Sequence, residues 1–130
     1  MKKDFDSWNK LKKGIHLSGE NKFYHPRDIW WCSLGLNVGV ESDGKGEEYR
    51  RPVIVIKGFS KKSFLGIVLT GKKVEGKYFL PLGKIGDREA SANLSQIRLF
   101  DTKRLVRKIG MLDEDNFSIL LKTIIGMFEI

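Results

Sequence analysis

A chain of 130 residues that is 41% hydrophobic has the length of one domain and enough apolar side chains for one core, which excludes a disordered chain. Its single cysteine, Cys32, excludes an intrachain disulfide, and neither a secretory leader nor a bilayer-spanning apolar segment is recognisable. We therefore expect a cytoplasmic protein that has no membrane anchor.

The first element that the sequence predicts is a short amphipathic helix near the N-terminus. Its apolar residues share one helical face, and Asp4 stands before them as a candidate cap; they are Phe5, Trp8, Leu11 and Ile15. Residues 1–26 are thus expected to form an N-terminal helical extension, and residues 27–130 the main domain.

A first strand is predicted over residues 29–34, an aromatic-rich run between Pro26 and Gly35. Cys32, inside this run, is expected to fill space in the core. Residues 35–49 then hold four glycines and a cluster of carboxylates, which is typical of a long loop. Long loops in compact domains often carry function.

The stretch EEYRRPVIVI, residues 47–56, predicts a strand that is buried on both faces, because four β-branched residues follow one another without polar alternation. Pro52 lacks a backbone donor and is expected to open this strand, over residues 52–57. Arg50 and Arg51 would then stand at the rim of a rigid core. They could be an ordinary solvated strand end or donors for a phosphate.

Three more strands are predicted over residues 63–70, 77–82 and 93–100, with turns at GFSKKS, TGKKVEGK and LGKIGD. From Asp113 onward, an acidic first turn and an apolar stripe predict a second helix that ends near Gly126 and packs on the strands. The expected fold class is mainly β with helices (α+β), a small antiparallel barrel with one helix at each end.

Positive charge is concentrated in the middle of the chain. Residues 50–108 hold 15 basic and 4 acidic side chains, whereas residues 1–49 hold 8 of each. A block of this kind suits a polyanion such as a nucleic-acid backbone, or an acidic partner segment. A basic surface that serves only solubility remains the alternative.

Several chemistries are not supported by the sequence. Residues 39–46, GVESDGKG, resemble a phosphate-binding loop but end in glycine where such a loop needs Ser or Thr, and no helix follows. His16, His25 and Cys32 do not have the spacing of metal ligands, and no catalytic triad with a clear nucleophile is evident. We expect no cofactor and no metal.

RNA cleavage needs no protein nucleophile, because RNA carries its own in the 2′-hydroxyl group. A protein that orients this group and stabilises developing charge can cleave the strand with arginine and hydroxyl donors alone. The candidate donors are Arg51, Thr70, Ser95, Gln96 and Arg98.

Four blocks of the sequence, DIWWCSLG, RRPVIVI, GIVLT and LSQIRLFDTKRL, together resemble the MazF/PemK family of toxin endoribonucleases from toxin–antitoxin systems. The resemblance runs from about Arg27 to Gly110. It implies an SH3-like barrel, a homodimer, and metal-independent cleavage of single-stranded mRNA that leaves a 2′,3′-cyclic phosphate and a 5′-hydroxyl. It also implies a cognate antitoxin, which we expect to have an acidic tail that covers the positive groove.

The family's arginine before proline falls on Arg51 and its threonine on Thr70, so the resemblance implies that these two are catalytic. Where many members have Ser or Thr this chain has Gly71, and where many have an acid it has Ser95, so the family's possible carboxylate base is missing. The residues expected to bind RNA are Arg50, Lys72, Lys73, Ser95, Gln96 and Arg98. Those of the loop that borders substrate and antitoxin are Gly39, Glu41, Gly44 and Glu48.

Two other functions remain open at this point. A barrel of the same fold could bind nucleic acid or protein without cutting it, to which the absent carboxylate at Ser95 points. A toxin of the gyrase-inhibiting branch could share the fold and act on a protein. The presence of both Arg51 and Thr70 favours the endoribonuclease over either alternative.

Overall fold

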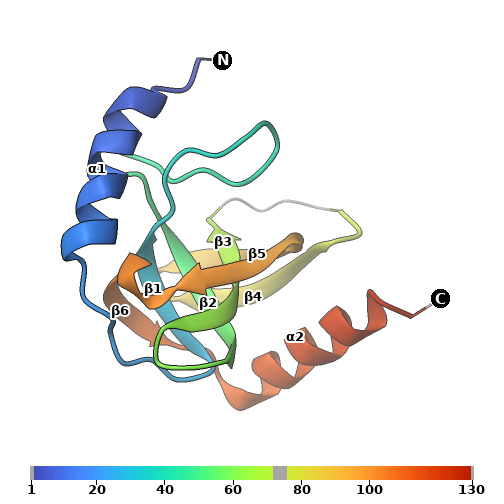
Figure 1. Cartoon of the computed structure of the whole chain (residues 1–130). Coiled ribbons are helices and arrows are strands. Elements are labelled where there is room, and N and C mark those ends of the chain that lie inside the picture. The colour runs from blue at the N-terminus through green and yellow to red at the C-terminus, as the bar shows by residue number, and fades with distance from the viewer. Residues whose placement is uncertain (1, 72–75, 130) are drawn as a thin grey trace.

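A computed structural model describes residues 2–71 and 76–129, and its centre is one antiparallel sheet (Figure 1). The six strands lie in the order β4-β5-β3-β2-β1-β6. Their bounds are β1 Asp28–Ser33, β2 Arg50–Gly58, β3 Ser63–Thr70, β4 Phe79–Ile85, β5 Arg88–Asp101 and β6 Leu105–Met111. Two helices, α1 (Phe5–Ser18) and α2 (Glu114–Gly126), and a short 3₁₀ helix η1 (Thr102–Arg104) complete the described chain. The predicted α+β class, mainly β with a helix at each end, is confirmed.

Strand β2 is buried on both faces, as its four β-branched residues predict. Val53 and Val55 belong to one apolar cluster with Phe64 and Phe100, whereas Ile54 and Ile56 belong to the other. Alternate side chains of a strand point to opposite faces, so one short run of sequence contributes to both halves of the core.

Helix α2 covers one of these two clusters. Leu120 and Ile124 are buried within it, and Phe117 and Leu121 pack at its margin. The helix begins where the sequence predicts, because the Asp113 carboxylate accepts hydrogen bonds from the backbone and the side chain of Asn116.

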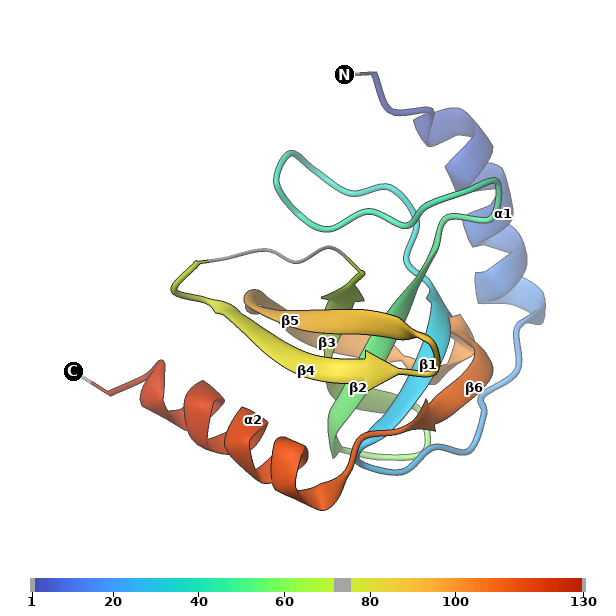
Figure 2. The same cartoon turned by 180° about the vertical axis from the view of Figure 1, so that it is seen from behind.

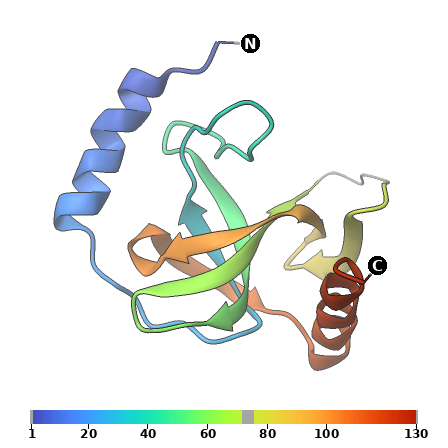
Figure 3. The ribbon, with the colours of Figure 1, turned by 45° about the vertical axis from the view of Figure 1, so that its right-hand side comes forward.

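Helix α1 lies on the other side of the sheet, as Figure 3 shows. Its cap is the predicted Asp4, whose carboxylate accepts a hydrogen bond from the Ser7 amide. Only part of the predicted apolar stripe packs on the rest of the protein, however, because Trp8 is buried whereas Phe5 and Leu11 are exposed. Helix α1 therefore contacts the rest of the protein mainly through one aromatic ring.

The prediction that Pro52 opens the second strand is wrong. Strand β2 begins at Arg50, and Pro52 is its third residue, opposite Trp31 of β1. Pairing of β2 with β3 begins only at Val53, so the missing backbone donor of Pro52 lies where the ladder is still one-sided. Both arginines are thus held in strand geometry.

Other boundaries also differ from those predicted. The turn expected over 82–87 is only the two residues Gly86 and Asp87, and Gly83, at φ +78°, forms a bulge inside β4. Figure 2 shows the resulting hairpin of β4 and the long strand β5. The segment TKRLVRKIG, left unassigned by the sequence, forms η1 and most of β6.

Candidate functional site

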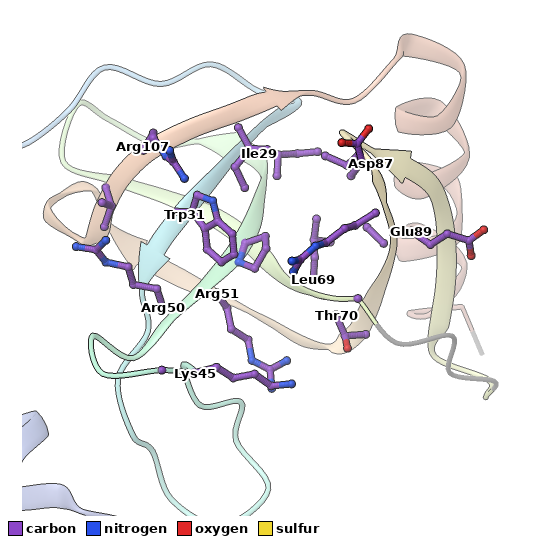
Figure 4. Close-up of a pocket in the computed structure, with 18 residues that line it drawn as sticks. Ile29, Trp31, Lys45, Arg50, Arg51, Leu69, Thr70, Asp87, Glu89 and Arg107 are labelled. Atoms are coloured by element: carbon purple, nitrogen blue, oxygen red, sulfur yellow. The ribbon is translucent and has the colours of Figure 1, made fainter.

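A pocket of about 1470 Å³ lies where β1, β2, β3 and β6 meet the β4–β5 hairpin (Figure 4). Its five basic lining residues come from four segments of the chain, namely the loop before β2, β2 itself, β5 and β6: Lys45, Arg50, Arg51, Arg88 and Arg107. Asp87 and Glu89 stand on the hairpin side, where Figure 4 shows the Glu89 carboxylate pointing away from the pocket. The lining therefore has a surplus of positive charge that suits an anion.

Arg51 is held at the mouth of β2, opposite Cys32 of β1, with its guanidinium half-buried. Burial lowers the pKa of Arg51 from its usual value, and the nearby Asp43 carboxylate opposes that shift. The group still stays protonated at neutral pH, since arginine does not lose its proton in proteins. Its Nε is buried and has no hydrogen-bond partner among the described residues. Arg51 thus presents fixed charge to the pocket without a direct ion pair in that part of the chain.

Arg50 has different surroundings although it also lines the pocket. Its guanidinium forms an ion pair with Glu48 at 2.8 Å, and its backbone is bridged to Lys45 by two hydrogen bonds of 3.0 Å. Figure 4 shows the Arg50 and Arg51 side chains leaving β2 in different directions, with that of Arg51 extending toward Lys45. Adjacent strand residues point to opposite sides, so the two guanidinium groups serve different parts of the pocket.

Thr70 is the last residue of β3, opposite Ser91 of β5, and is half-buried in the lining of the same pocket. Figure 4 places it below the hairpin residues, on the side of the pocket toward which Arg51 extends. The two residues that the sequence nominates as catalytic therefore share one pocket, although 18 residues separate them along the chain and strands β2 and β3 carry them.

The other three candidate donors do not line this pocket. The Ser95 hydroxyl is exposed and donates to Asn93 Oδ1 at 2.6 Å. Arg98 is half-buried over the ring of Phe100, 4.8 Å from its centroid, and burial lowers its pKa while Glu41 opposes the shift. Of the five candidate donors, therefore, Arg51 and Thr70 line this pocket and the other three do not.

Gln96 is already engaged with the long loop, residues 35–49. Its Oε1 accepts a hydrogen bond from the Ser42 amide at 2.9 Å, and its Nε2 donates to the Val40 carbonyl at 3.1 Å. This glutamine therefore fastens the loop to β5 instead of facing the pocket.

The four loop residues named from the sequence have separate structural roles. Gly39 adopts φ +55°, and Gly44 lies so close to the Tyr49 backbone that a Cβ would collide with it. Glu41 accepts from the Val38 amide, and Glu48 pairs with Arg50. Lys72 and Lys73, also predicted to bind RNA, lie outside the described residues.

Sequence reasoning missed several lining residues, notably Lys45, Arg88, Arg107 and Trp31. Arg107 is brought opposite Trp31 by the pairing of β6 with β1. The burial of β6 shows no regular alternation along LVRKI, and only the sheet topology shows which strand it joins. Arg88 could have been noted as the first residue after the Gly-Asp turn.

The described residues contain neither a metal-binding cluster nor a membrane-spanning helix. No group of three or more His, Cys, Asp or Glu side chains in that part of the chain is arranged to hold a metal ion. None of its helices is long and apolar enough to cross a membrane.

Solved structures with the same fold include three proteins of low sequence identity to this chain. MazF from Deinococcus radiodurans gives a TM-score of 0.68 at 13% identity and covers 84% of this chain and 99% of its own. The Mycobacterium tuberculosis toxin MazF-mt6 gives 0.60 at 15%, covering 78% and 96%. An endoribonuclease in complex with its cognate antitoxin, from a mycobacterial species, gives 0.59 at 12%, covering 83% and 100%.

At these identities the structural likeness establishes the fold alone. A sequence search of the curated proteins finds no significant match. A family model does match: residues 25–128 fit the model described as PemK-like, MazF-like toxin of type II toxin–antitoxin system. This match covers the whole sheet, both arginines, Thr70 and helix α2, and excludes α1. The chain therefore belongs to the family of PemK-like, MazF-like toxins of type II toxin–antitoxin systems.

Proposed function

We propose that this protein is an endoribonuclease that cleaves single-stranded mRNA without a metal ion. The observation that carries the proposal is that Arg51 and Thr70 line one positively charged pocket in a chain of this toxin family. The structure with a cognate antitoxin bound is that of an endoribonuclease, which supports the same activity here.

The proposed reaction uses the 2′-hydroxyl of the RNA as nucleophile. The 2′-oxygen bonds to phosphorus as its proton leaves to solvent, and the bond from phosphorus to the 5′-oxygen breaks. The products are a 2′,3′-cyclic phosphate and, after the 5′-oxygen takes up a proton, a 5′-hydroxyl. No oxidant, reductant or cofactor enters this balance.

Arg51 would stabilise the charge that develops on the phosphate oxygens. A permanently charged donor fixed by strand β2 is already in place when the charge appears, which is the condition for strong electrostatic stabilisation. Thr70 would orient the phosphate through its hydroxyl from the end of β3. With Ser95 where many family members have a carboxylate, orientation and charge stabilisation carry the proposed mechanism.

The remaining basic residues would hold the RNA strand. Lys45, Arg50, Arg88 and Arg107 surround the pocket, and each phosphate contact that they make would release counterions. Ser95, Gln96 and Arg98 stay predicted RNA contacts outside this pocket. Lys72 and Lys73, which are not among the described residues, also stay predicted RNA contacts. Because Gln96 is hydrogen-bonded to Val40 and Ser42, its use by RNA would require the loop to move.

We further propose two protein partners. The first is an antitoxin whose acidic, initially disordered tail lies over the positive pocket and orders as it binds. The second is another copy of this chain, in a homodimer. Co-purification with the product of an adjacent reading frame should yield a complex that leaves RNA intact. If the complex cut RNA as fast as the free protein, the inhibitory tail would be refuted.

One experiment separates the proposal from its two alternatives. Pure protein is incubated with a long single-stranded RNA in EDTA, and the ends of the fragments are mapped. We expect discrete cuts with 5′-hydroxyl and cyclic phosphate ends. RNA that is bound but intact would identify a non-catalytic binding module, and intact RNA together with inhibition of gyrase would identify the gyrase-inhibiting alternative.

A further inference from the structure

The N-terminal segment contacts both ends of loop 35–49, the loop that leads directly into Arg50 and Arg51. Trp8 is buried against Gly35, where the Trp8 ring leaves no room for a Cβ. The same ring lies edge-on to Tyr49, with centroids 5.7 Å apart. The Tyr49 carbonyl also accepts hydrogen bonds from the amides of Leu34 and Gly35. The base of the loop is thus closed on itself beneath one tryptophan.

Lys3 holds the outer part of the same loop. Its ammonium group donates to the Asn37 carbonyl at 2.6 Å and the Gly39 carbonyl at 3.1 Å, and pairs with Asp43 at 2.9 Å. The Lys3 side chain is only 15% exposed and that of Asp43 23%, so this is no ordinary surface ion pair. Three bonds from one ammonium use its full donor capacity.

The opposite side of the loop is fastened to the sheet. Gln96 of β5 bonds to Ser42 and Val40, and the Asp43 carboxylate also accepts from the Asn37 amide at 2.6 Å. The outer loop is therefore clamped between the N-terminal segment and strand β5.

Asp43 connects this clamp to the pocket. It is the carboxylate whose field opposes the effect of burial on the pKa of Arg51. Asp43 also lies two residues before Lys45, which lines the pocket, so its negative charge stands near the place where a phosphate would approach Arg51. Because Lys3 is paired with Asp43, it reduces the negative charge that the incoming phosphate meets.

We propose that Lys3 and Trp8 are positioning residues, which clamp loop 35–49 against β5 and hold Asp43 in an ion pair beside the RNA-binding pocket. Lys3 and Trp8 lie before the residues that the family model matches, 25–128, whereas loop 35–49 and Gln96 lie within them. The effect of this clamp on RNA rests on the proposed function, whereas its effect on the loop does not.

The test compares Lys3→Ala with Lys2→Ala, which removes the same charge from the exposed neighbouring residue. Amide hydrogen exchange is measured at the hydrogen-bonded loop amides of Asn37, Ser42 and Gly44 in the full chain. We expect exchange at these amides to rise about tenfold or more in Lys3→Ala, and to stay at the wild-type rate in Lys2→Ala. Amides of strands β2 and β3 should keep their protection in both variants.

The kinetic arm measures RNA cleavage by the same proteins. Lys3→Ala should raise KM several-fold with little change in kcat, because the negative charge of Asp43 near the pocket would no longer be balanced by Lys3. In an Asp43→Asn background, the Lys3→Ala change should leave KM nearly unaltered, since the charge that it unmasks is gone.

The outcomes separate the clamp from the proposed function. Equal loop exchange in Lys3→Ala and Lys2→Ala would overturn the clamp whatever happens to RNA. Faster loop exchange in Lys3→Ala, in a chain whose wild type cuts no RNA, would support the clamp and refute the endoribonuclease. Faster exchange with unchanged KM in an active enzyme would refute the link between the loop and the pocket.

Discussion

At the residue scale, the two adjacent arginines show how a strand gives identical side chains different tasks. Arg50 forms an ion pair with Glu48 and turns away from Arg51, whereas Arg51 has no ion pair with any of the described residues. A catalytic donor needs a fixed position and a charge that is not already paired with a carboxylate, and Arg51 meets both conditions better than Arg50 does.

For Arg50 we predict a role in RNA binding. Arg50→Ala should weaken RNA binding and reduce the salt dependence of the affinity by roughly one phosphate contact. Lys57→Ala removes the same charge from the exposed far end of β2, outside the pocket, and serves as the control. RNA affinities of the wild type and both variants, measured by fluorescence anisotropy across a salt series, give the slopes to be compared. An unchanged slope in Arg50→Ala would remove this residue from the interface.

Cys32 gives a second prediction at this scale. Burial strongly raises the pKa of this thiol above its ordinary value of 9.0, so the folded protein keeps the thiol protonated where the unfolded chain loses the proton. The folded state then binds more protons, and stability present below pH 9 is lost as the pH rises further. Between pH 9 and 10.5 the melting temperature should fall more steeply for the wild type than for Cys32→Ala. Parallel curves would contradict this.

At the element scale, helix α2 is attached to the sheet by a few fully buried side chains. Leu120 is 0% exposed in the cluster that α2 covers. Leu120→Ala should lower the free energy of unfolding by about 2–5 kcal/mol, because it leaves a cavity in that cluster. Lys122→Ala, at an exposed position of the same helix, should change it by less than about 0.5 kcal/mol. Urea unfolding measures both, and similar small losses would mean that α2 is not part of the cooperative core.

Elements were predictable where local chemistry decides them. The cap Asp4, the acidic start of α2 and the doubly buried run from Val53 to Ile56 follow from neighbouring residues, and the structure confirms them. Strand β6 and the bulge at Gly83 were not predicted, because long-range pairing determines both. The start of β2 was misplaced for the same reason. Pro52 is tolerated inside the strand because β3 begins to pair only at Val53, and the sequence does not show where that pairing begins.

In the candidate site, too, local motifs were readable from the sequence and long-range contacts were not. A resemblance in short motifs nominated Arg51 and Thr70, and the topology then placed both in one pocket. Lys45, Arg88 and Arg107 escaped notice because no motif marks them and only the folded sheet gathers them. The contacts of Lys3 with Asn37 and Asp43 span more than 30 positions of sequence, and no local pattern indicates such contacts.

At the scale of the whole molecule, the apolar surface available for a dimer does not lie on the aromatic-rich strand β1. Ile29, Trp30 and Cys32 of this strand are buried within the single chain. Exposed apolar side chains lie elsewhere, such as Leu99 on β5 and Phe128 after α2. Burial of such residues between two copies would lower the free energy of association.

We therefore predict that the protein is a homodimer in solution. Multi-angle light scattering at micromolar concentration should give twice the chain mass of 14.9 kDa. The measurement should be made at low and high salt, because an association driven by apolar burial should survive screening of the net charge of +8. A monomer mass under both conditions would refute the dimer.

The claim that Arg51 makes this protein an RNA-cleaving enzyme is tested most directly by single-turnover cleavage at saturating RNA in EDTA. Wild type, Arg50→Ala and Arg51→Ala are compared after thermal melting has shown that all three are folded. We expect Arg51→Ala to cleave about 10² to 10³ times more slowly, through loss of a preorganised donor to the developing charge. Arg50→Ala should cleave near the wild-type rate, since saturation offsets its weaker binding. Equal rates for the two variants would contradict the account and leave Arg51 an ordinary solvated strand end.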